Sequence, residues 1–260
     1  MEIRTRLVNY MKELGDKDLC VAFSGGVDSS VILRAACEAA VTFETKLHPK
    51  ADLPQAQRVA KETGAIHHVI YVNELDNEEM LNNPENRCYL CKKYLFQNLL
   101  AFAAEKGIDT IMEGNNADDL HVYRPGTKAV KELGVLSPLA ELGITKAQVR
   151  EIAADMGLSC ASRPSSPCLA TRLPYGTPIS FELLERVDAG EQWMKEQGFP
   201  IVRLRVHGDI LRIEIEKERF ADFIAMSDQI TAKMKELGFA YITLDAEGFR
   251  SGSMDVHIVK

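Results

Sequence analysis

The sequence predicts an α/β fold: a doubly wound, mostly parallel sheet followed by a second, smaller α+β domain. Over the first half, short apolar runs alternate with segments of helical periodicity, which is typical of parallel sheets. A segment broken by four prolines then precedes two alternating runs typical of a hairpin. Parallel sheets bind ligands at the carboxyl ends of their strands, and the polar segments of this chain follow predicted strands. The strands of the sheet are expected at 19–23, 41–45, 66–72 and 109–113.

The helices of the first half follow from periodicity and end signals. Ile3, Leu7, Met11 and Leu14 recur at helical spacing, and Gly15 ends this helix, which we expect to cover the sheet. Further helices are expected directly after the first strand, from Asp52 as N-cap to about Thr63, over 74–81, over 88–106, and from Thr145 as N-cap through Met156.

The proline-broken segment 157–178 marks a change of domain. We expect an ATP-binding domain over 1–165 and a substrate-binding α+β domain over 166–260. The second domain is expected to contain a helix capped by Ser180, a hairpin of 201–206 and 210–215, a helical pattern over 218–237, and strands near 239–244 and 255–259.

Length and composition narrow the class of protein. The 260 residues suit one α/β domain with a smaller companion, and 46% hydrophobic residues allow a real core. No run approaches the length of a membrane span and the first residues have no apolar signal region, so we expect a cytoplasmic protein without a membrane partner. Lys plus Arg number 31 against 38 Asp plus Glu, a net charge of -7, which argues against a nucleic-acid partner.

The segment from Ser24 to Ser30 is a candidate phosphate-binding loop. Two glycines allow a sharp turn and close approach of the backbone, and the free amides at the start of the following helix favour an anion. The loop lacks the lysine of a Walker loop. A short glycine turn before a helix is also often a simple connection. The candidate ATP-binding residues here are Ser24, Gly25, Gly26, Asp28, Ser29 and Ser30.

A second polar loop, 114–119, follows the fourth predicted strand and belongs to the same edge of the sheet. Gly114 and Asp118 are its candidate ATP-binding residues. Adjacent carboxylates can hold a hydrated Mg²⁺, but capping of a helix explains them equally well.

The six cysteines divide into core residues and reactive or metal-binding thiols. Cys20 and Cys37 lie in apolar segments and are expected in the core. Cys88 and Cys91 begin a helix, where positions i and i+3 share a face and the dipole lowers the pKa of a thiol. A thioredoxin-type redox pair is a weaker interpretation. A zinc site is another interpretation of this pair. Its remaining ligands would come from Cys160 and Cys168 in the proline-broken segment.

Five motifs occur in order along nearly the whole chain: SGGVDSS at 24–30, GNNADD at 114–119 with YRPG after it, SSPCLATRLPYG at 165–176, RVHGD at 205–209 and GFRSGS at 248–253. Together they resemble the LarE family of PP-loop sulfur transferases, which build the nickel-pincer nucleotide of lactate racemase. The phosphate loop alone is shared with NAD synthetase, GMP synthetase and tRNA thiolases.

The resemblance implies that ATP adenylylates a pyridinium-3,5-dicarboxylate mononucleotide and that sulfur then replaces AMP. Better-known members surrender sulfur from the cysteine that matches Cys168. This chain also has Cys88 and Cys91, so it resembles the three-cysteine subgroup. There, Cys88, Cys91 and Cys168 would bind three irons of a 4Fe-4S cluster whose fourth iron carries sulfide from an external donor. A trimer-based homo-hexamer is implied by analogy, and the implied substrate-binding residues are Arg172, Glu191, Arg203, Glu214, Asp222 and Arg250.

Two other functions remain open from the sequence. Thiolation of tRNA is carried out by related three-cysteine proteins, although the acidic balance of this chain argues against it. The second open function is binding of AMP or a metal without catalysis. For Arg205 and Arg212, a solvated charged sheet face is as good an interpretation as a binding site.

Overall fold

The computed structural model of the chain describes residues 2–15, 18–36, 39–121 and 124–255. The chain divides into two compact units. The first unit comprises Met1–Glu78 and Asn86–Ser166, and the second comprises Glu79–Glu85 and Pro167–Lys260. The segment Glu79–Glu85 is therefore part of the second unit, although it lies between two stretches of the first in the sequence.

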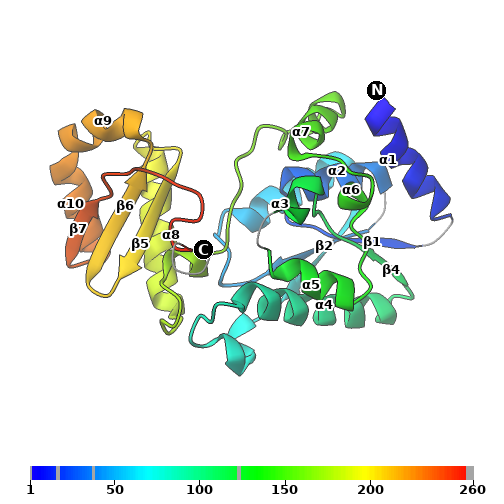
Figure 1. Cartoon of the computed structure of the whole chain (residues 1–260), viewed down its shortest axis with the longest axis horizontal. Coiled ribbons are helices and arrows are strands. Elements are labelled where there is room, and N and C mark those ends of the chain that lie inside the picture. The colour runs from blue at the N-terminus through cyan, green and yellow to red at the C-terminus, as the bar shows by residue number, and fades with distance from the viewer. Residues whose placement is uncertain (1, 16–17, 37–38, 122–123, 256–260) are drawn as a thin grey trace. The chain divides into compact units, whose positions relative to one another are not determined.

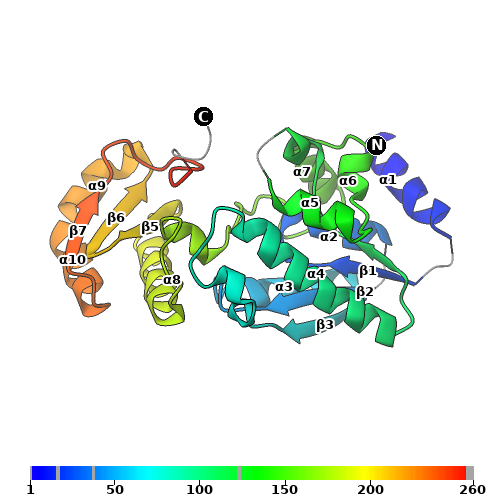
Figure 2. The ribbon, with the colours of Figure 1, turned by 60° about the horizontal axis from the view of Figure 1, so that its bottom comes forward.

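A four-stranded parallel sheet forms the centre of the first unit, which confirms the predicted fold class. Its strand order is β3-β2-β1-β4, and β1, β2 and β3 lie side by side in Figure 2. All three pairings within it are parallel, as expected for strands joined through helices. The strands are β1 (Leu19–Ala22), β2 (Ala39–Glu44), β3 (Ile66–Tyr71) and β4 (Thr110–Met112).

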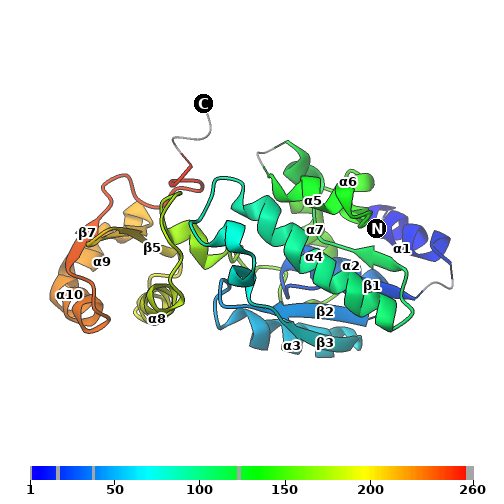
Figure 3. The same cartoon turned by 90° about the horizontal axis from the view of Figure 1, so that it is seen from below.

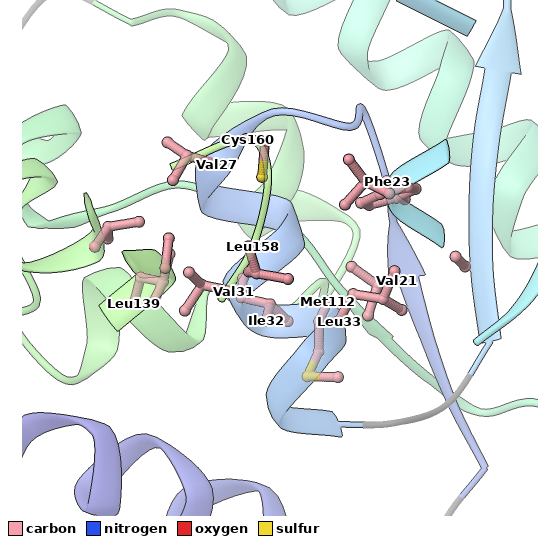
Figure 4. Packing of buried hydrophobic residues seen from close by; sticks show 14 of the residues in the cluster. Val21, Phe23, Val27, Val31, Ile32, Leu33, Met112, Leu139, Leu158 and Cys160 are labelled. Carbon is pink, nitrogen blue, oxygen red and sulfur yellow. The ribbon is translucent and has the colours of Figure 1, made fainter. Parts of the chain in front are cut away.

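Helices cover both faces of this sheet (Figure 1). One face packs against α1 (Glu2–Glu13), α2 (Val27–Ala36), α3 (Asp52–Thr63), α6 (Pro138–Glu141) and α7 (Lys146–Asp155). The other packs against α4 (Arg87–Glu105) and α5 (Gly126–Glu132). The larger of the two cores contains Val27, Val31, Leu158 and Cys160 (Figure 4). The turn after β1 is thereby fixed to a helix that is buried along one side.

Most predicted helix ends are confirmed. Thr145 and Gln148 form a capping box at the start of α7, and Gly64 ends α3 with a φ of 77°. Asp52 is not the N-cap of α3, because the side chain of Asp52 pairs with Arg163 instead. The expected helix over 74–81 is two short turns, η1 (Glu74–Asp76) and η2 (Glu78–Met80); a third turn, η3 (Ala117–Leu120), follows β4.

A three-stranded sheet of order β5-β6-β7 organises the second unit. The predicted hairpin is confirmed as antiparallel β5 (Val202–His207) and β6 (Ile210–Ile215), and β7 (Tyr241–Leu244) runs parallel to β6. Figure 3 shows α8 (Phe181–Glu196) and α10 (Ser227–Glu236) on one face of this sheet. Gly190 lets α8 approach closely, since a Cβ there would lie 2.5 Å from a methyl group of Leu204.

The last third of the second unit differs in part from the expected elements. The helical pattern over 218–237 is one short turn, η5 (Lys217–Arg219), and two helices, α9 (Phe220–Ala225) and α10, with a break at Met226. The strand expected at 255–259 falls almost entirely outside the described residues, as do Cys37 and Tyr123. Among the helices that the structure describes, none is long and apolar enough to cross a bilayer.

Candidate active site

The predicted phosphate loop is pressed against a neighbouring helix. Gly25 has a φ of 67°, and a Cβ at this position would lie 2.7 Å from the Cα of Ala56 on α3, so no side chain fits. Gly26 accepts a hydrogen bond at its carbonyl oxygen from Ser30 Oγ (2.7 Å) and donates its amide to Ser24 Oγ (3.3 Å). These contacts hold the backbone of the loop at the N-terminus of α2, where helix amides favour an anion.

The loop after β4 lies directly against this turn. A Cβ on Gly114 would be 3.0 Å from the amide nitrogen of Ser29, so glycine allows the close approach. Asn116 Nδ2 donates to Asp28 Oδ1 (3.0 Å). The structure thus brings together Asp28 and Gly114, which the sequence placed at one edge of the sheet.

The two adjacent aspartates of this loop differ in what they contact. Asp119 is buried, accepts the amide of Asn116 at 3.0 Å as part of a capping box, and pairs with Arg124 at 3.0 Å. Asp118 is exposed and accepts the backbone amide of Lys146 (2.9 Å). Capping therefore explains Asp119, whereas Asp118 keeps a solvent-facing carboxylate that can contact a ligand.

Lys146 is a site residue that the sequence analysis missed. Its ammonium group pairs with Asp28 Oδ2, and its backbone amide donates to Asp118, so one residue joins the two candidate carboxylates. Lys146 is the first residue of α7, directly after the cap Thr145. The capping box located this helix start, but only the fold shows that it adjoins the phosphate loop.

The first turn of α4 carries the predicted thiol pair and is tied to the same edge of the sheet. Cys88 is exposed and Cys91 is half-buried. Lys92 Nζ pairs with the buried carboxylate of Glu113 at 2.8 Å, and Glu113 directly precedes Gly114. A Cβ on Gly126 would lie 3.0 Å from Lys92 Cδ and 3.3 Å from the carbonyl oxygen of Cys88. The thiol pair is therefore fixed between the end of β4 and the start of α5.

Two further thiols among the described residues of the first unit lie in the core. Cys160 is 1% exposed and Cys20 is fully buried, which confirms the expectation for Cys20. Burial raises the pKa of Cys20 to about 12, so this thiol is neutral at physiological pH. Within the described part of the chain, no group of three or more His, Cys, Asp or Glu side chains is arranged to hold a metal ion.

Part of the proline-broken segment returns to the phosphate loop. Arg163 donates to the carbonyl oxygen of Gly25 (3.3 Å) and to the carboxylate of Asp52 (2.6 Å). Ser166 Oγ donates to the other oxygen of Asp52 (3.0 Å). This is why Asp52 is not available as a helix cap.

In the second unit, Arg172 and Glu191 form a buried pair. Both are 1% exposed, and the Nε and Nη2 atoms of Arg172 each donate to one carboxylate oxygen of Glu191 at 2.9 Å. Burial acts to raise the pKa of Glu191, but Arg172 outweighs burial and the pKa lies below its usual value. Arg172 Nη1 donates to the carbonyl oxygens of Pro167 (2.9 Å) and Cys168 (3.0 Å). The pair therefore fixes the backbone that carries Cys168.

A second buried carboxylate lies on β6. Glu214 is fully buried and accepts hydrogen bonds from Arg205 (3.1 Å), Arg212 (3.0 Å) and Ser253 Oγ (2.6 Å). Arg205 is 5% exposed and also donates to the carbonyl oxygen of Thr171 (2.9 Å), so a solvated face is the wrong interpretation for it. The RVHGD and GFRSGS segments thus meet at one carboxylate.

Arg203 on β5 lies beside an aromatic ring and is partly buried. Its guanidinium donates to the carbonyl oxygen of Val202 (2.7 Å) and lies 5.3 Å from the centre of the Phe249 ring. Its pKa lies below the usual value, chiefly because the group is partly buried and, after the opposing effect of Glu191, because Arg172 repels it. A bound anion would offset both effects.

The other two predicted substrate residues lie nearer the surface. Arg250 pairs with Glu247 at 2.7 Å and lies 3.5 Å from Asp245, which also pairs with Arg212. Asp222 on α9 pairs with Arg219, the last residue of η5, at 3.1 Å, and both side chains are exposed. Arg250 is thus linked to the arginine and carboxylate network through Asp245, and the Asp222 pair is a surface feature.

The fold and the first unit's site define the class of protein. A parallel sheet with a glycine turn after its first strand, and carboxylates from the loop after β4 against that turn, is the arrangement of the PP-loop ATP pyrophosphatases. Residues 4–122 match the family described as asparagine synthase. The NMN synthetase of Francisella tularensis shares the fold, with a TM-score of 0.52 and 17% identity over 64% of this chain and 74% of that chain.

Two curated relatives match both units. The pyridinium-3,5-bisthiocarboxylic acid mononucleotide synthase of Lactiplantibacillus plantarum is 34% identical over 99% of this chain and 95% of its own length. The protein slr1717 of Synechocystis, described as uncharacterized, is 36% identical over 99% of this chain and 100% of its own. A tRNA-specific 2-thiouridylase of Rickettsia peacockii is more distant, at 26% identity over 60% of this chain and 55% of its own. The chain belongs to the family of the pyridinium-3,5-bisthiocarboxylic acid mononucleotide synthase, and with it to the ATP-dependent sulfur transferases.

Proposed function

We propose that this protein uses ATP to convert the carboxylates of a pyridinium-3,5-dicarboxylate mononucleotide into thiocarboxylates, on the way to a nickel-pincer nucleotide. In the first step, a carboxylate oxygen of the substrate attacks the α-phosphorus of ATP, and pyrophosphate leaves. In the second, a sulfide sulfur attacks the acyl carbon, and the bond from that carbon to the AMP oxygen breaks. AMP is a far better leaving group than the oxygen of a free carboxylate, which is why ATP is needed.

One observation carries the proposal. The similarity to the synthase extends over 99% of the chain and so includes both the phosphate loop and the arginine-rich second unit. The match to the asparagine synthase family ends at residue 122 and so does not include the arginine-rich part of the second unit, which begins at Pro167. A protein that only needed to bind AMP would have no use for the charged network of the second unit.

In the first unit, we assign the ATP contacts to the phosphate loop and the two carboxylates beside it. The backbone of Ser24, Gly25 and Gly26 and the first turn of α2 would hold the pyrophosphate group. Asp28 and Asp118 would supply the oxygen ligands that Mg²⁺ prefers, and the ammonium group of Lys146, which pairs with Asp28, would add positive charge for the phosphates. The remaining residues assigned to ATP are Ser29, Ser30 and Gly114.

In the second unit, we assign binding of the substrate's phosphate to its surplus of positive charge. Among the described residues, the five arginines 172, 203, 205, 212 and 250 interact with four carboxylates, those of Glu191, Glu214, Asp245 and Glu247. Arg203 and Arg250 would contact the anion, because both are partly exposed whereas Arg172 and Arg205 are buried. Arg172 and Glu191 would hold the backbone that carries Cys168, and Glu214 would hold Arg205 and Arg212. Asp222 is also assigned to the substrate site.

For the supply of sulfur, we propose that Cys88, Cys91 and Cys168 hold a 4Fe-4S cluster. Thiolates are the ligands such clusters use, and two of the three thiols lie on one turn of α4 near the carboxyl edge of the sheet. When bound, such a cluster supplies an iron that three protein thiolates leave open to an external sulfide. The chain's own part is to hold the three thiols and to keep Cys160 away from them in the core.

Anaerobic reconstitution with iron and sulfide tests the cluster. We expect close to four irons per wild-type chain, with the charge-transfer absorption of a 4Fe-4S cluster, and less than half of that iron in Cys91→Ser. Cys160→Ser is the matched control, because this thiol is 1% exposed and should leave the iron count unchanged. Equal iron in wild type and Cys91→Ser would remove the cluster from the proposal and leave Cys168 as a sacrificial donor.

Incubation with ATP, Mg²⁺, sulfide and the pyridinium dicarboxylate nucleotide tests the reaction. We expect pyrophosphate, AMP and the thiocarboxylate product to appear together, with the thiocarboxylate identified by its mass. If pyrophosphate release did not require the pyridinium nucleotide, or if no pyrophosphate were released, the proposed reaction would be rejected. The protein would then be one that binds AMP or a metal without turnover.

Thiolation of tRNA is the second candidate function, because the similarity to the tRNA-specific 2-thiouridylase covers 60% of this chain. Binding of bulk tRNA measured by gel shift separates the two. Tight binding that weakens steeply with salt would favour the tRNA substrate. The net charge of -7 leads us to expect no shift at physiological salt. A homo-hexamer stays a prediction, which sedimentation velocity measures.

A further inference from the structure

The segment Glu79–Glu85 crosses from the first unit into the second and returns immediately before the thiol pair of α4. Cys88 is five positions after Asn83 in the sequence. Contacts that fix the position of Asn83 therefore also restrain the short stretch of chain that leads to Cys88 and Cys91.

Asn83 has an unusual backbone conformation and a fully buried side chain. Its φ of 47° makes it the single non-glycine residue with a positive φ in the described part of the chain. Asparagine tolerates this region better than most residues, but the conformation still needs support from its surroundings. Its exposed fraction is 0%, whereas the neighbouring Asn82 is exposed.

The side chain of Asn83 binds the loop that follows Cys168. Nδ2 donates to the carbonyl oxygens of Pro174 (2.9 Å) and Leu173 (3.2 Å), with Ala170 as a longer contact at 3.5 Å. An amide group has two N–H donors, so both are used. Ala170 is two positions after Cys168 in the sequence.

The backbone of the same segment extends this contact. The carbonyl oxygen of Asn83 accepts the amide of Gly176 (3.1 Å), and that of Leu81 accepts the amide of Ile179 (2.8 Å). Met80 is 1% exposed. The segment is thus hydrogen-bonded to the loop 170–179 by backbone and side chain together.

We propose that Asn83 is a positioning residue for sulfur transfer: its buried amide fastens the chain leading to Cys88 and Cys91 onto the loop that carries Cys168. Arg172, within the same loop, binds the backbone directly before it through the carbonyl oxygens of Pro167 and Cys168. We call this contact between Asn83 and the loop 170–179 the clamp. Cys88 and Cys168, which are far apart in the sequence, each lie only a few residues along the chain from it. The proposal rests on the proposed function for the chemistry that the thiols perform.

Cross-linking of the full chain tests the clamp without any enzymatic assay. The metal-free protein is treated anaerobically with a short bifunctional maleimide, and peptide mass spectrometry measures the link between Cys88 and Cys168. We expect the link in wild type, a yield within twofold in Asn82→Ala, and at least a fivefold loss in Asn83→Gly. Glycine keeps the positive φ and removes the side chain with both of its N–H donors. Asn83→Asp is a second variant, since it retains the size and removes the donor.

Equal cross-linking in wild type, Asn83→Gly and Asn83→Asp would overturn the proposal, as would no link in wild type. A loss of the link together with the loss of the folded state, seen by circular dichroism in both variants, would assign Asn83 to general stability instead and also overturn it.

A second readout uses the reaction itself. In Asn83→Gly we expect pyrophosphate release within twofold of wild type, and a ratio of thiocarboxylate to pyrophosphate at least fivefold lower. Release and transfer that fall in proportion would contradict a role in positioning the thiols. If wild type releases no pyrophosphate, the proposed function fails, while the cross-link still decides whether the clamp exists.

Discussion

The carboxylates assigned to the candidate sites of the two units have opposite environments. In the first, Asp28 and Asp118 are partly or fully exposed, and they are held by an asparagine amide, a lysine and a backbone N–H. In the second, Glu191 and Glu214 are 1% and 0% exposed, and arginines saturate them. An exposed carboxylate can exchange a protein partner for a metal or phosphate at small cost, whereas a buried pair cannot be parted cheaply. The first arrangement suits ligand exchange, and the second suits a scaffold.

Glu191→Gln is expected to have the largest effect, because it leaves the charge of Arg172 buried and unpaired. The free energy of unfolding should fall by about 3–5 kcal/mol. Denaturation by urea measures the change, and Arg4→Ala is the control, since its pair with Asp155 is exposed and should contribute less than about 1 kcal/mol. A loss below 1 kcal/mol in Glu191→Gln would show that the buried pair is not a scaffold.

The same pair predicts a pH dependence. The pKa of Glu191 is lower in the folded protein than its usual value of about 4.3, so the folded state binds fewer protons than the unfolded state in that range. The stabilisation from the pair is then fully present above about pH 4.3 and is lost as the pH falls through the lower, folded value. We expect the difference in unfolding free energy between wild type and Glu191→Gln to shrink below about pH 4.3. A difference that stays constant from pH 7 to pH 3 would contradict this assignment.

Gly25→Ala is expected to distort the phosphate loop for two reasons, backbone strain and steric overlap, which a control variant can separate. Alanine at a φ of 67° is strained, and its Cβ would also lie 2.7 Å from the backbone of Ala56. Strain and overpacking together should cost about 2–4 kcal/mol, and ATP-dependent pyrophosphate release should be lost. Gly134→Ala is matched, because its φ is also 67° and nothing lies within 4 Å of the added Cβ. Equal effects of the two variants would mean that the contact with α3 is unimportant.

Lys146→Met tests whether the exposed carboxylates of the first unit work with a cation. We expect pyrophosphate release to fall by about 10²-fold, because one charged contact to a transition state contributes that order of rate. The unfolding free energy should change by less than about 1 kcal/mol, since the pair with Asp28 is partly exposed. A rate within threefold of wild type would limit Lys146 to orienting Asp28.

Asp222→Asn is expected to have the smallest effect on stability. The pair with Arg219 is exposed on both sides and should contribute less than about 1 kcal/mol. If Asp222 belongs to the substrate site, the KM for the pyridinium nucleotide should rise several-fold with kcat nearly unchanged. An unchanged KM would remove Asp222 from the site and leave a surface pair.

Local patterns predicted the elements of both units well, and they failed where a distant partner competes. The Thr145 capping box and the end of α3 at Gly64 depend on neighbours in the sequence, and both are confirmed. Asp52 has the residue type and spacing of a cap, but Arg163 and Ser166, more than a hundred positions away, bind its carboxylate. A local hydrogen bond to one amide is weaker than an ion pair with an arginine that already contacts the phosphate loop.

The sequence by itself determined the order of strands and helices, the glycine turn before α2, and the thiols at the start of α4, because periodicity and end signals act over a few residues. Only the tertiary structure decided that Lys146 joins Asp28 to Asp118, that Arg172 is buried against Glu191, and that Asn83 belongs with the loop after Cys168. These contacts link residues from 19 to 118 positions apart. Their partners are chosen by burial and by competition among many donors and acceptors, which no local pattern records.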